Sequence, residues 1–336
     1  MSHTIMFYNL ENLYDTIKDP DGKGNEFTPT GRKRWTMERY NARLNNLSEV
    51  FAAVASAHGG FPAVVGVSEV ENIGVMKALA SRRKMEPAHY ECLHYESNDT
   101  RGVDVGAFYR PDLFDLIGSE PVKLVLRSGR EYIGRNILCF WGMMAGEMFV
   151  FYVCHFLSRR AGVDTSAGFR RAGAETVRDH AAGMAKKYPG IKVVVMGDMN
   201  DNPSDDSLAL LLKARRSPVL TGPGEYFNPF WQLYDEGRGS SRFYNKWVMY
   251  DNIIVSRNLI KANEKTSTFR KFFGAFLGSS RKSDGKLGIV KIDSRCYGEI
   301  FKRSFMLHRG WPRRAFNGDH YISGYSDHLP VLIKLV

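Results

Sequence analysis

Short apolar segments recur along the chain at about the length of a β-strand. They are rich in Val, Ile, Phe and Tyr and lie at residues 4–8, 63–70, 103–109, 136–141, 148–155, 192–196, 249–255 and 329–335. Short runs of this composition, separated by polar and turn-forming residues, are typical of β-strands. The pattern therefore predicts a sheet-rich protein.

Two longer segments, 38–57 and 167–187, read as helices. In the first, Leu44, Leu47, Phe51 and Val54 fall on one helical face, as in an amphipathic helix. Strands mixed with a few helices indicate an α/β or α+β sandwich. No internal repeat and no linker rich in Pro, Gly or Ser divides the chain. We therefore predict a single domain over residues 1–336, with an elaboration of one end of the sheet at about 257–320.

The charge of this elaboration distinguishes it from the rest of the chain. The formal net charge of the protein is +11, and residues 257–320 contain 15 Lys/Arg against 5 Asp/Glu. Aromatic residues lie among these charges, namely Phe269, Phe272, Phe273, Tyr297, Phe301, Phe305 and Trp311. This composition fits contact with a polyanion such as nucleic acid or with an anionic membrane surface. The alternative is a solvated surface with local salt bridges.

The remaining bulk properties exclude several protein classes. Hydrophobic residues make up 43% and charged residues 25% of the chain, which is ordinary for a globular protein. No apolar run reaches the length of about 18 residues that a membrane-spanning helix needs, and the N-terminus lacks the pattern of a signal peptide. We expect a cytoplasmic protein, unless a leader has been removed. The four cysteines have no metal-ligand spacing and are predicted to be reduced and mostly buried.

Polar residues gather where the apolar segments end. They are Asn9, Glu69, His155, Asp198, Asn200, Asp251, Asp327 and His328. Carboxylate and amide oxygens suit a hard cation such as Mg²⁺, which binds few protein carboxylates and keeps several waters. Cysteines, which a zinc site would favour, are absent from this set. The strand ends therefore predict an oxygen-rich metal site.

Two of these strand ends carry short polar motifs. Asp198 and Asn200 follow an apolar run and fall on one face by strand alternation, although Asp198 to Pro203 also has the composition of a turn or helix N-cap,. Asp327 and His328 precede the last strand and point to opposite sides of an extended chain. One can then bind a metal while the other meets a different partner.

In order along the chain, these motifs resemble the endonuclease/exonuclease/phosphatase superfamily. The matching segments are Tyr8-Asn9-Leu10-Glu11-Asn12, Ser68-Glu69-Val70, His155, Gly197-Asp198-Met199-Asn200, Tyr250-Asp251-Asn252-Ile253 and Ser326-Asp327-His328-Leu329-Pro330. The opening segment Tyr8 to Asp15 is most similar to a bacterial group of that superfamily. The resemblance implies a four-layer α/β/β/α sandwich of the deoxyribonuclease I type and metal-dependent hydrolysis of phosphate esters.

The resemblance also implies roles for individual residues. Glu69 would be the principal metal ligand, helped by Asn9 and Asp327, with Mg²⁺ as the ion and Mn²⁺ as the alternative. Asp198 would position the attacking water, and Asn200 would donate to a phosphate oxygen. His328, oriented by Asp251, would be the general base or a phosphate ligand.

A histidine at position 155 resembles deoxyribonuclease I and the sphingomyelinases, since exonuclease III enzymes have a tyrosine there. His155 is then a general-acid candidate, with Asp104 as its carboxylate partner. Arg101, Arg159 and Arg160 are candidate phosphate ligands because a guanidinium can bind two phosphate oxygens. Asn136 stands where an acidic or small residue is expected, and the basic elaboration has no counterpart in the minimal nucleases.

The sequence is compatible with more than one class of phosphate-ester substrate. The basic elaboration favours a nuclease that cleaves nucleic acid by in-line attack of water. A phosphoinositide phosphatase or a sphingomyelinase-like phosphodiesterase is the alternative, because basic surfaces also bind anionic lipid headgroups. The inositol phosphatase signature is missing, since Met196 replaces the Trp before Gly197. A binding protein without catalysis is a minor alternative, because every expected ligand is present.

Overall fold

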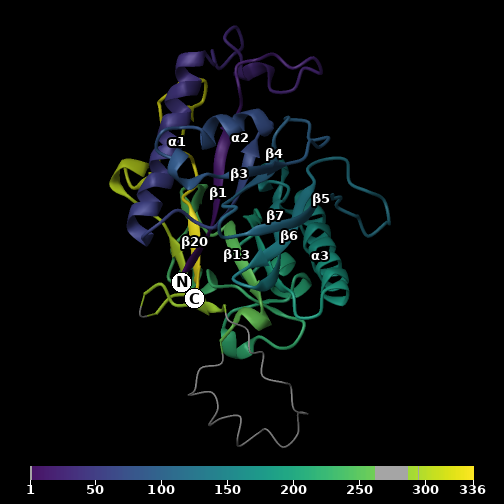
Figure 1. Cartoon of the computed structure of the whole chain (residues 1–336). Helices are drawn as coiled ribbons and strands as arrows, with labels where there is room; N and C mark the ends of the chain where they lie inside the picture. Colours follow the sequence, from purple (N-terminus) through teal and green to yellow (C-terminus); the bar gives the residue numbers. More distant parts are fainter. Residues whose placement is uncertain (1, 262–286, 294) are drawn as a thin grey trace, which may run out of the picture.

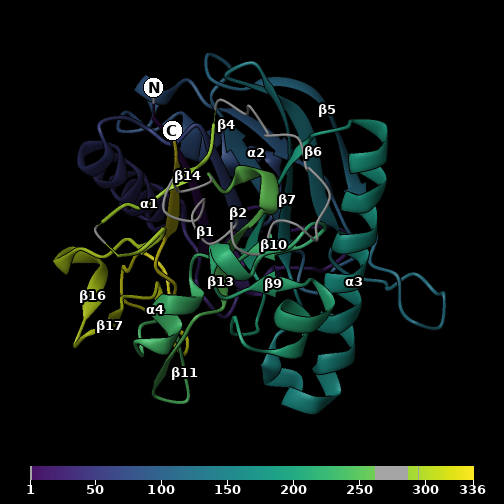
Figure 2. The same ribbon diagram turned by 90° about the horizontal axis from the view of Figure 1, so that it is seen from below.

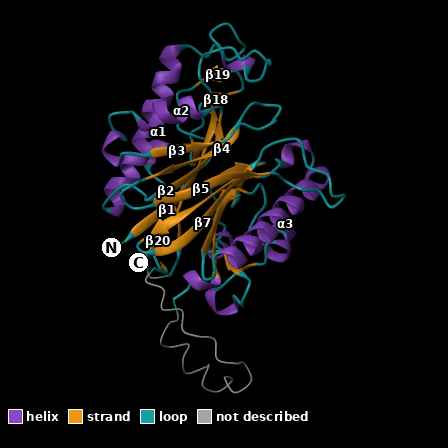
Figure 3. Ribbon diagram, turned by 45° about the vertical axis from the view of Figure 1, so that its right-hand side comes forward, coloured by secondary structure: helices purple, strands orange, loops and turns teal. Residues whose placement is uncertain are grey.

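The computed structural model describes residues 2–261, 287–293 and 295–336. Part of the basic elaboration, including Phe269, Phe272 and Phe273, lies outside these residues. Two large mixed sheets form the centre of the described structure, with helices on their outer faces (Figures 1 and 3). Strands and helices occur at all the positions that the apolar pattern predicts.

The first sheet has the order β14-β20-β1-β2-β4-β3, and β15 also pairs with β20. Its strands are β1 (His3–Leu13), β2 (Val64–Val70), β3 (Glu91–His94), β4 (Asp104–Tyr109), β14 (Ile289–Val290), β15 (Gly298–Ile300) and β20 (Val331–Leu335). Strands β14 and β15 belong to the basic elaboration. This elaboration therefore extends the edge of the first sheet.

The second sheet has the order β5-β6-β7-β8-β13-β10-β9. Its strands are β5 (Asp115–Val122), β6 (Ile137–Met144), β7 (Glu147–His155), β8 (Lys192–Asp198), β9 (Ala214–Arg215), β10 (Tyr226–Phe227) and β13 (Asp251–Ser256). Three hairpins lie outside both sheets. They are β11 (Ser241–Phe243) with β12 (Lys246–Val248), β16 (Leu307–His308) with β17 (Trp311–Pro312), and β18 (Phe316–Asn317) with β19 (His320–Tyr321).

Helices α1 (Met37–His58) and α2 (Ile73–Ala80) cover the first sheet, and α3 (Val163–Lys187) covers the second. The short helix α4 (Trp231–Asp235) lies near the hairpins. Figure 2 shows α1 and α3 on opposite sides with the strands between them. Helix α1 begins where Thr36 accepts a hydrogen bond from the Arg39 amide and ends at Gly59 with φ of 74°, as helix-capping preferences predict. The predicted four-layer sandwich is therefore confirmed.

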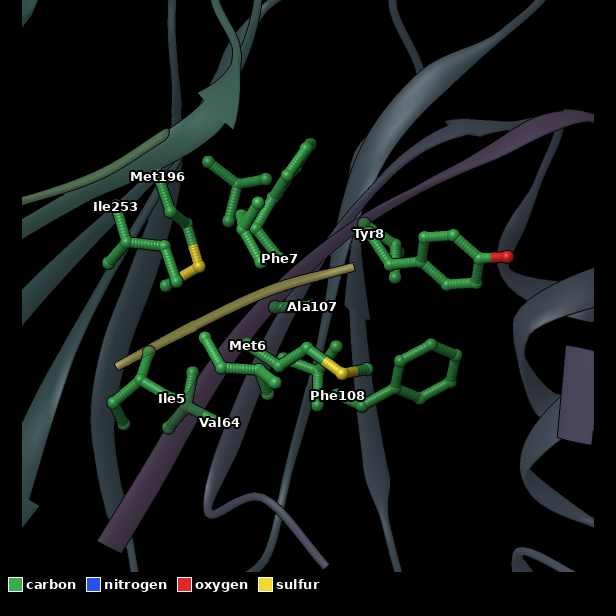
Figure 4. Close-up of a cluster of buried hydrophobic side chains, with 14 of the residues drawn as sticks. Ile5, Met6, Phe7, Tyr8, Val64, Ala107, Phe108, Met196 and Ile253 are labelled. Carbon is green, nitrogen blue, oxygen red and sulfur yellow. The ribbon is translucent and has the colours of Figure 1, made fainter. Parts of the chain in front are cut away.

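Apolar side chains from both sheets meet in one core. Phe7 of β1 and Phe108 of β4 belong to the same buried cluster as Met196 of β8 and Ile253 of β13 (Figure 4). A second cluster lies between the outer face of the second sheet and α3, with Tyr152 and Val177 among its members. The shared core supports the proposal of one domain.

All four cysteines are free thiols, and Cys92 is the least buried of them. In the part of the chain that the structure describes, no helix combines the length and the apolar character needed to cross a bilayer.

Candidate active site

The polar strand ends meet at one edge of the two sheets. Strands β1 and β2 are parallel, as are β7 and β8, whereas β20 and β13 run antiparallel to β1 and β8. The C-terminal ends of β1, β2, β7 and β8 therefore lie beside the N-terminal ends of β20 and β13, at the upper edge in Figure 1. In the second sheet, His155, Asp198 and Asp251 are direct cross-strand neighbours.

Asp198 occupies the middle of this group. Its Oδ2 atom accepts a hydrogen bond from Asn9 Nδ2 at 3.1 Å, and it lies 3.7 Å from Nε2 of both His155 and His328. Burial raises the pKa of this carboxyl to about 7. One carboxylate oxygen thus contacts side chains from both sheets.

His328 is held by a carboxylate on its other ring nitrogen. Its Nδ1 atom lies 2.7 Å from Asp251 Oδ2, and the Ser240 hydroxyl also donates to that oxygen. Burial alone would lower the pKa of His328, but Asp251 and Asp198 outweigh it and keep this pKa well above its usual value. His328 is therefore an imidazolium at neutral pH.

His155, by contrast, is neutral. Burial lowers its pKa well below the usual value, and the nearby Arg135 guanidinium lowers it further. Its Nε2 atom lies 3.8 Å from Glu69 Oε1 and 3.7 Å from Asp198 Oδ2. A neutral imidazole cannot donate as an acid before it gains a proton. The protonated His328 is therefore better suited than the neutral His155 to donate a proton or to bind a phosphate.

Glu69 lies at an irregular point of β2. The register with β4 shifts between Ser68 and Val70, and Glu69 has a φ of 61°, so this residue forms a bulge in a conformation that non-glycine residues seldom adopt. Its Oε2 atom accepts hydrogen bonds from the Asn12 amide at 2.9 Å and from Arg101 Nη2 at 3.2 Å. Strained bulges of this kind are common next to active sites.

Charge keeps Glu69 ionised despite its burial. Burial would raise the pKa of this carboxyl, but the Arg101 guanidinium and the charged His328 hold it well below its ordinary value. Arg101 also donates to Asn12 Oδ1. The predicted phosphate ligand Arg101 therefore lies at the site, where it pairs with the predicted metal ligand.

The predicted metal ligands lie beside Asp198 and the two histidines. Asn9 reaches it through Asp198, and Asp327 Oδ1 lies 4.0 Å from His328 Nε2 while its Oδ2 pairs with Arg314 at 3.0 Å. Donor atoms of Asp198, Asp251 and His328 lie within 4.8 Å of one another. An ionised Glu69 and the neighbouring aspartate carboxylates provide oxygen donors that fit a hard divalent cation,.

Asn200 and Arg159 stabilise the segment that follows Asp198. The Asn200 amide donates to Asp198 Oδ1 at 3.0 Å, and Asn200 Nδ2 donates to the Phe156 carbonyl at 3.0 Å. Arg159 donates to the Asn200 carbonyl at 2.8 Å and to the carboxylates of Asp201 and Asp205. Arg159 thus stabilises the loop at residues 200–205 after β8. Its expected role as a phosphate ligand has no support from these contacts, and Arg160 is exposed.

Asp104 has partners other than the one expected from the sequence. Its carboxylate accepts hydrogen bonds from the Ser97 hydroxyl and, at 3.2 Å, from the Ser97 amide, and it lies 3.8 Å from His94 Nε2. The carboxylates beside His155 are Glu69 and Asp198 instead. Asp104 therefore belongs to a neighbouring cluster, apart from His155.

Three residues of the site had no signal in the sequence. Ser240 donates to Asp251, Arg314 pairs with Asp327, and Arg135 lines a small pocket beside His155. Each lies in a segment between regular strands, where no periodic pattern points to its partner. Ser and Arg are also common surface residues, so only the folded chain identifies them.

The sequence matches a known family over most of its length. Residues 4–281 match the profile described as the Endonuclease/Exonuclease/phosphatase family. The chain belongs to this family. The expected superfamily is thereby confirmed, and the protein is an enzyme that hydrolyses phosphoric esters, a chemistry that in this family generally requires a divalent metal.

Solved structures of the endonuclease/exonuclease/phosphatase fold are similar to this chain throughout. The mannosyl-6-phosphatase Bt3783 of Bacteroides thetaiotaomicron has a TM-score of 0.56 at 14% identity, with 99% of each chain covered. The human Nocturnin catalytic domain with bound sulfate has the same TM-score and identity, with 100% of this chain and 94% of that chain covered. D. rerio TDP2 with a single-strand DNA product has a TM-score of 0.51 at 14% identity, with 100% and 99% covered. No curated protein matches in sequence. At these identities, the likenesses show the fold.

Proposed function

We propose that the protein is a Mg²⁺-dependent phosphodiesterase that cleaves the backbone of nucleic acid by in-line attack of water. The observation that carries the chemistry is the position of Asp198 Oδ2, which contacts Asn9 and faces both His155 and His328. A buried carboxylate between two imidazoles can orient a water and accept its proton. Mn²⁺ is the alternative ion.

The residues then have distinct tasks. The His328 imidazolium, oriented by Asp251, binds a phosphoryl oxygen and stabilises the charge that develops on it. Asp198 positions the nucleophilic water, and Asn200 keeps the Asp198 carboxylate in place through its backbone amide. Glu69, with Asn9 and Asp327, would hold the metal ion, which neutralises charge on the phosphate when bound.

A hairpin beside the catalytic histidine supports a nucleic-acid substrate. Ser241, the first residue of β11, forms a β-bridge with His328. From the same strand, exposed Arg242 lies over the ring of Trp311 at 4.6 Å, and Trp311 is 4.9 Å from Trp247. A cation and aromatic rings next to the scissile phosphate suit a chain of phosphates and bases.

Other aromatic residues of the elaboration do not contribute to such a surface. Phe301 is buried, and Tyr297 and Phe305 pack against the core. The β11–β12 hairpin and the basic side chains therefore support a nucleic-acid substrate, whereas these three aromatic residues do not. Of the fold neighbours, TDP2 is solved with a single-strand DNA product and Bt3783 is a mannosyl-6-phosphatase, so both substrate classes belong in the test.

Activity on a panel of phosphate esters tests the proposal. The panel holds single- and double-stranded DNA, RNA, bis-p-nitrophenyl phosphate, mannose 6-phosphate, phosphoinositides and sphingomyelin, each with Mg²⁺ or Mn²⁺. We expect cleavage of nucleic acid by the wild type, and a loss of at least about 100-fold in His328→Asn. His89→Asn is the matched control, because His89 is exposed and has a φ of 49° that asparagine tolerates,. Release of phosphate from sugar or lipid substrates alone would overturn the nuclease proposal.

The hairpin is tested separately. Arg242→Gln should raise KM for an oligonucleotide severalfold and leave hydrolysis of bis-p-nitrophenyl phosphate unchanged, because the small substrate has no neighbouring nucleotides for Arg242 and Trp311 to bind. Arg83→Gln, at an exposed position after α2, is the control. An equal effect of Arg242→Gln on both substrates would contradict a role in recognition.

A further inference from the structure

A second cluster of metal-binding residue types lies on the outer face of the second sheet. Glu120 of β5, Cys139 of β6 and Tyr152 of β7 are successive cross-strand neighbours, so their side chains point to the same face. Helix α3 covers that face (Figure 3), and His180 is one of its residues. Cys139 and Tyr152 are fully buried there.

The donor atoms of this cluster have spacings that suit a shared ion. The ligand atoms of Glu120, Cys139 and His180 lie within 4.8 Å of one another. His180 Nε2 and Glu120 Oε1 are 3.4 Å apart, which is longer than the 2.7–2.9 Å typical of a charge-assisted hydrogen bond. A tetrahedral ion with bonds of about 2.0–2.1 Å would hold a nitrogen and an oxygen roughly 3.3 Å apart. The observed separation of 3.4 Å is therefore closer to that of two ligands of one ion than to that of a hydrogen bond.

The other nitrogen of His180 is already fixed. Nδ1 lies 2.9 Å from the Tyr152 hydroxyl, and when Nδ1 carries the proton and donates it to this oxygen, Nε2 has its lone pair free on the side of Glu120. A hydrogen bond on the second ring nitrogen is the usual way in which a protein orients a metal-binding histidine. Glu120 and His180 are partly exposed, with 46% and 27% of their side chains accessible, so an ion and a water ligand can enter from solvent.

We propose that Glu120, Cys139 and His180 form a binding site for one Zn²⁺ ion, separate from the catalytic edge. Thiolate, imidazole and carboxylate together select a borderline-soft ion, whereas the oxygen-rich catalytic site selects a hard one. On binding, the Cys139 thiol releases its proton to solvent and the sulfur forms a bond to zinc, with no change of oxidation state. A solvent water completes the four ligands.

The position of this site indicates a structural role. Tyr152 faces α3, whereas His155, three residues later on the same strand, belongs to the opposite face by alternation and lies roughly 10 Å further along. Bound zinc would link the edge strand β5 to β6 and to α3. Because binding to the folded state alone stabilises that state, zinc should raise the melting temperature.

Cobalt and zinc binding to the full chain test this proposal. Protein treated with chelator and thiol reductant is titrated with Co²⁺ in excess Mg²⁺, and Zn²⁺ affinity is measured against a chromogenic chelator. We expect a thiolate-to-cobalt charge-transfer band and one tightly held zinc per chain. The band should be absent from Cys139→Ala, and zinc affinity should fall at least tenfold in His180→Gln.

Two further variants serve as controls and keep the test decisive. Cys92→Ser removes a thiol on the other sheet, and His89→Gln removes an exposed histidine; both should retain the band and the affinity. His180→Gln changes a partly exposed residue, so it reports even where Cys139→Ala does not fold. No charge-transfer band in the wild type, or unchanged zinc affinity and zinc-dependent melting temperature in His180→Gln, would overturn the proposal.

Discussion

Asp251 Oδ2 lies 2.7 Å from Nδ1 of His328, although the two residues are 77 positions apart in the chain. Strand β13 begins at Asp251, and β20 begins just after His328, so the pair joins the starts of two strands that belong to different sheets. The Ser240 hydroxyl donates to the same carboxylate oxygen. A buried carboxylate with two donors fixes the orientation and the charge of the imidazole.

Replacement of Asp251 by asparagine should therefore damage catalysis more than folding. Asp251→Asn keeps the shape of the side chain but removes the charge that raises the pKa of His328. We expect kcat on bis-p-nitrophenyl phosphate to fall by about 10²–10⁴-fold at pH 7. Ser240→Ala should cost only about tenfold, because it removes one hydrogen bond to the carboxylate. Activity of Asp251→Asn within threefold of the wild type would contradict the pairing, provided that circular dichroism shows an intact fold.

Glu69→Gln should weaken metal binding without opening the bulge of β2. Glutamine can still accept the hydrogen bond from the Asn12 amide, but it lacks the negative charge that a divalent cation requires. We expect the Kd for Mn²⁺, measured by electron paramagnetic resonance, to rise on the order of 100-fold. Glu91→Gln is the control, since Glu91 is exposed on β3 and accepts from Tyr109. The same Kd in Glu69→Gln and wild type would exclude Glu69 as a ligand.

The repeating apolar pattern was sufficient to predict the main strands and both long helices. It missed α2 and β3, and also the edge strand β5, where Asp115, Ser119 and Glu120 interrupt the apolar residues. The pattern also gave no sign of the bulge at Glu69 or of the extension of β1 to Leu13. These features depend on the partner strand, and a single segment carries no information about its partner.

The candidate site could be assembled from the sequence only through the resemblance to a family. Period-two alternation placed Asp198 and Asn200 together, but nothing local connects Asp251 with His328. The partners of Asp104 and Arg159 were not predicted, because Ser97, His94 and Asp205 lie in segments without a periodic pattern. The catalytic and metal-binding roles of the individual residues stay predictions.

Arg43 should be essential for stability, because it satisfies several backbone carbonyls below the site. This buried side chain of α1 donates to the carbonyls of Leu10, Glu11, Gly324 and Tyr325. Arg43→Met would leave these buried carbonyl acceptors without their donor,. We expect the free energy of unfolding in urea to fall by about 3–5 kcal/mol.

An exposed arginine provides the comparison for Arg43. Arg83→Met, at the surface after α2, should change the free energy of unfolding by less than about 0.5 kcal/mol. A similar small effect for Arg43→Met would mean that water satisfies the carbonyls in place of the guanidinium.

Asp104 should make the stability of the protein depend on pH. Burial raises the pKa of this carboxyl from 3.8 to about 6, so the folded state holds a proton that the unfolded state has lost between these two values. The stability contributed by Asp104 is therefore fully present below pH 3.8 and is lost as the pH rises through about 6. In Asp104→Asn the side chain stays neutral at every pH and can still accept one of the two hydrogen bonds from Ser97, which end on different carboxylate oxygens,.

The unfolding free energies of wild type and Asp104→Asn should consequently diverge with pH. Measured in urea at pH 4 and pH 7, the difference between them should shift by up to about 3 kcal/mol in favour of the variant, from about 1.4 kcal/mol per unit of pKa. Asp112→Asn is the control, since Asp112 is exposed and should leave the pH profile of the wild type unchanged. Parallel profiles for wild type and Asp104→Asn would show that the Asp104 carboxyl is ionised in the folded protein across this range, with the Ser97 hydrogen bonds and the Arg135 guanidinium stabilising its charge.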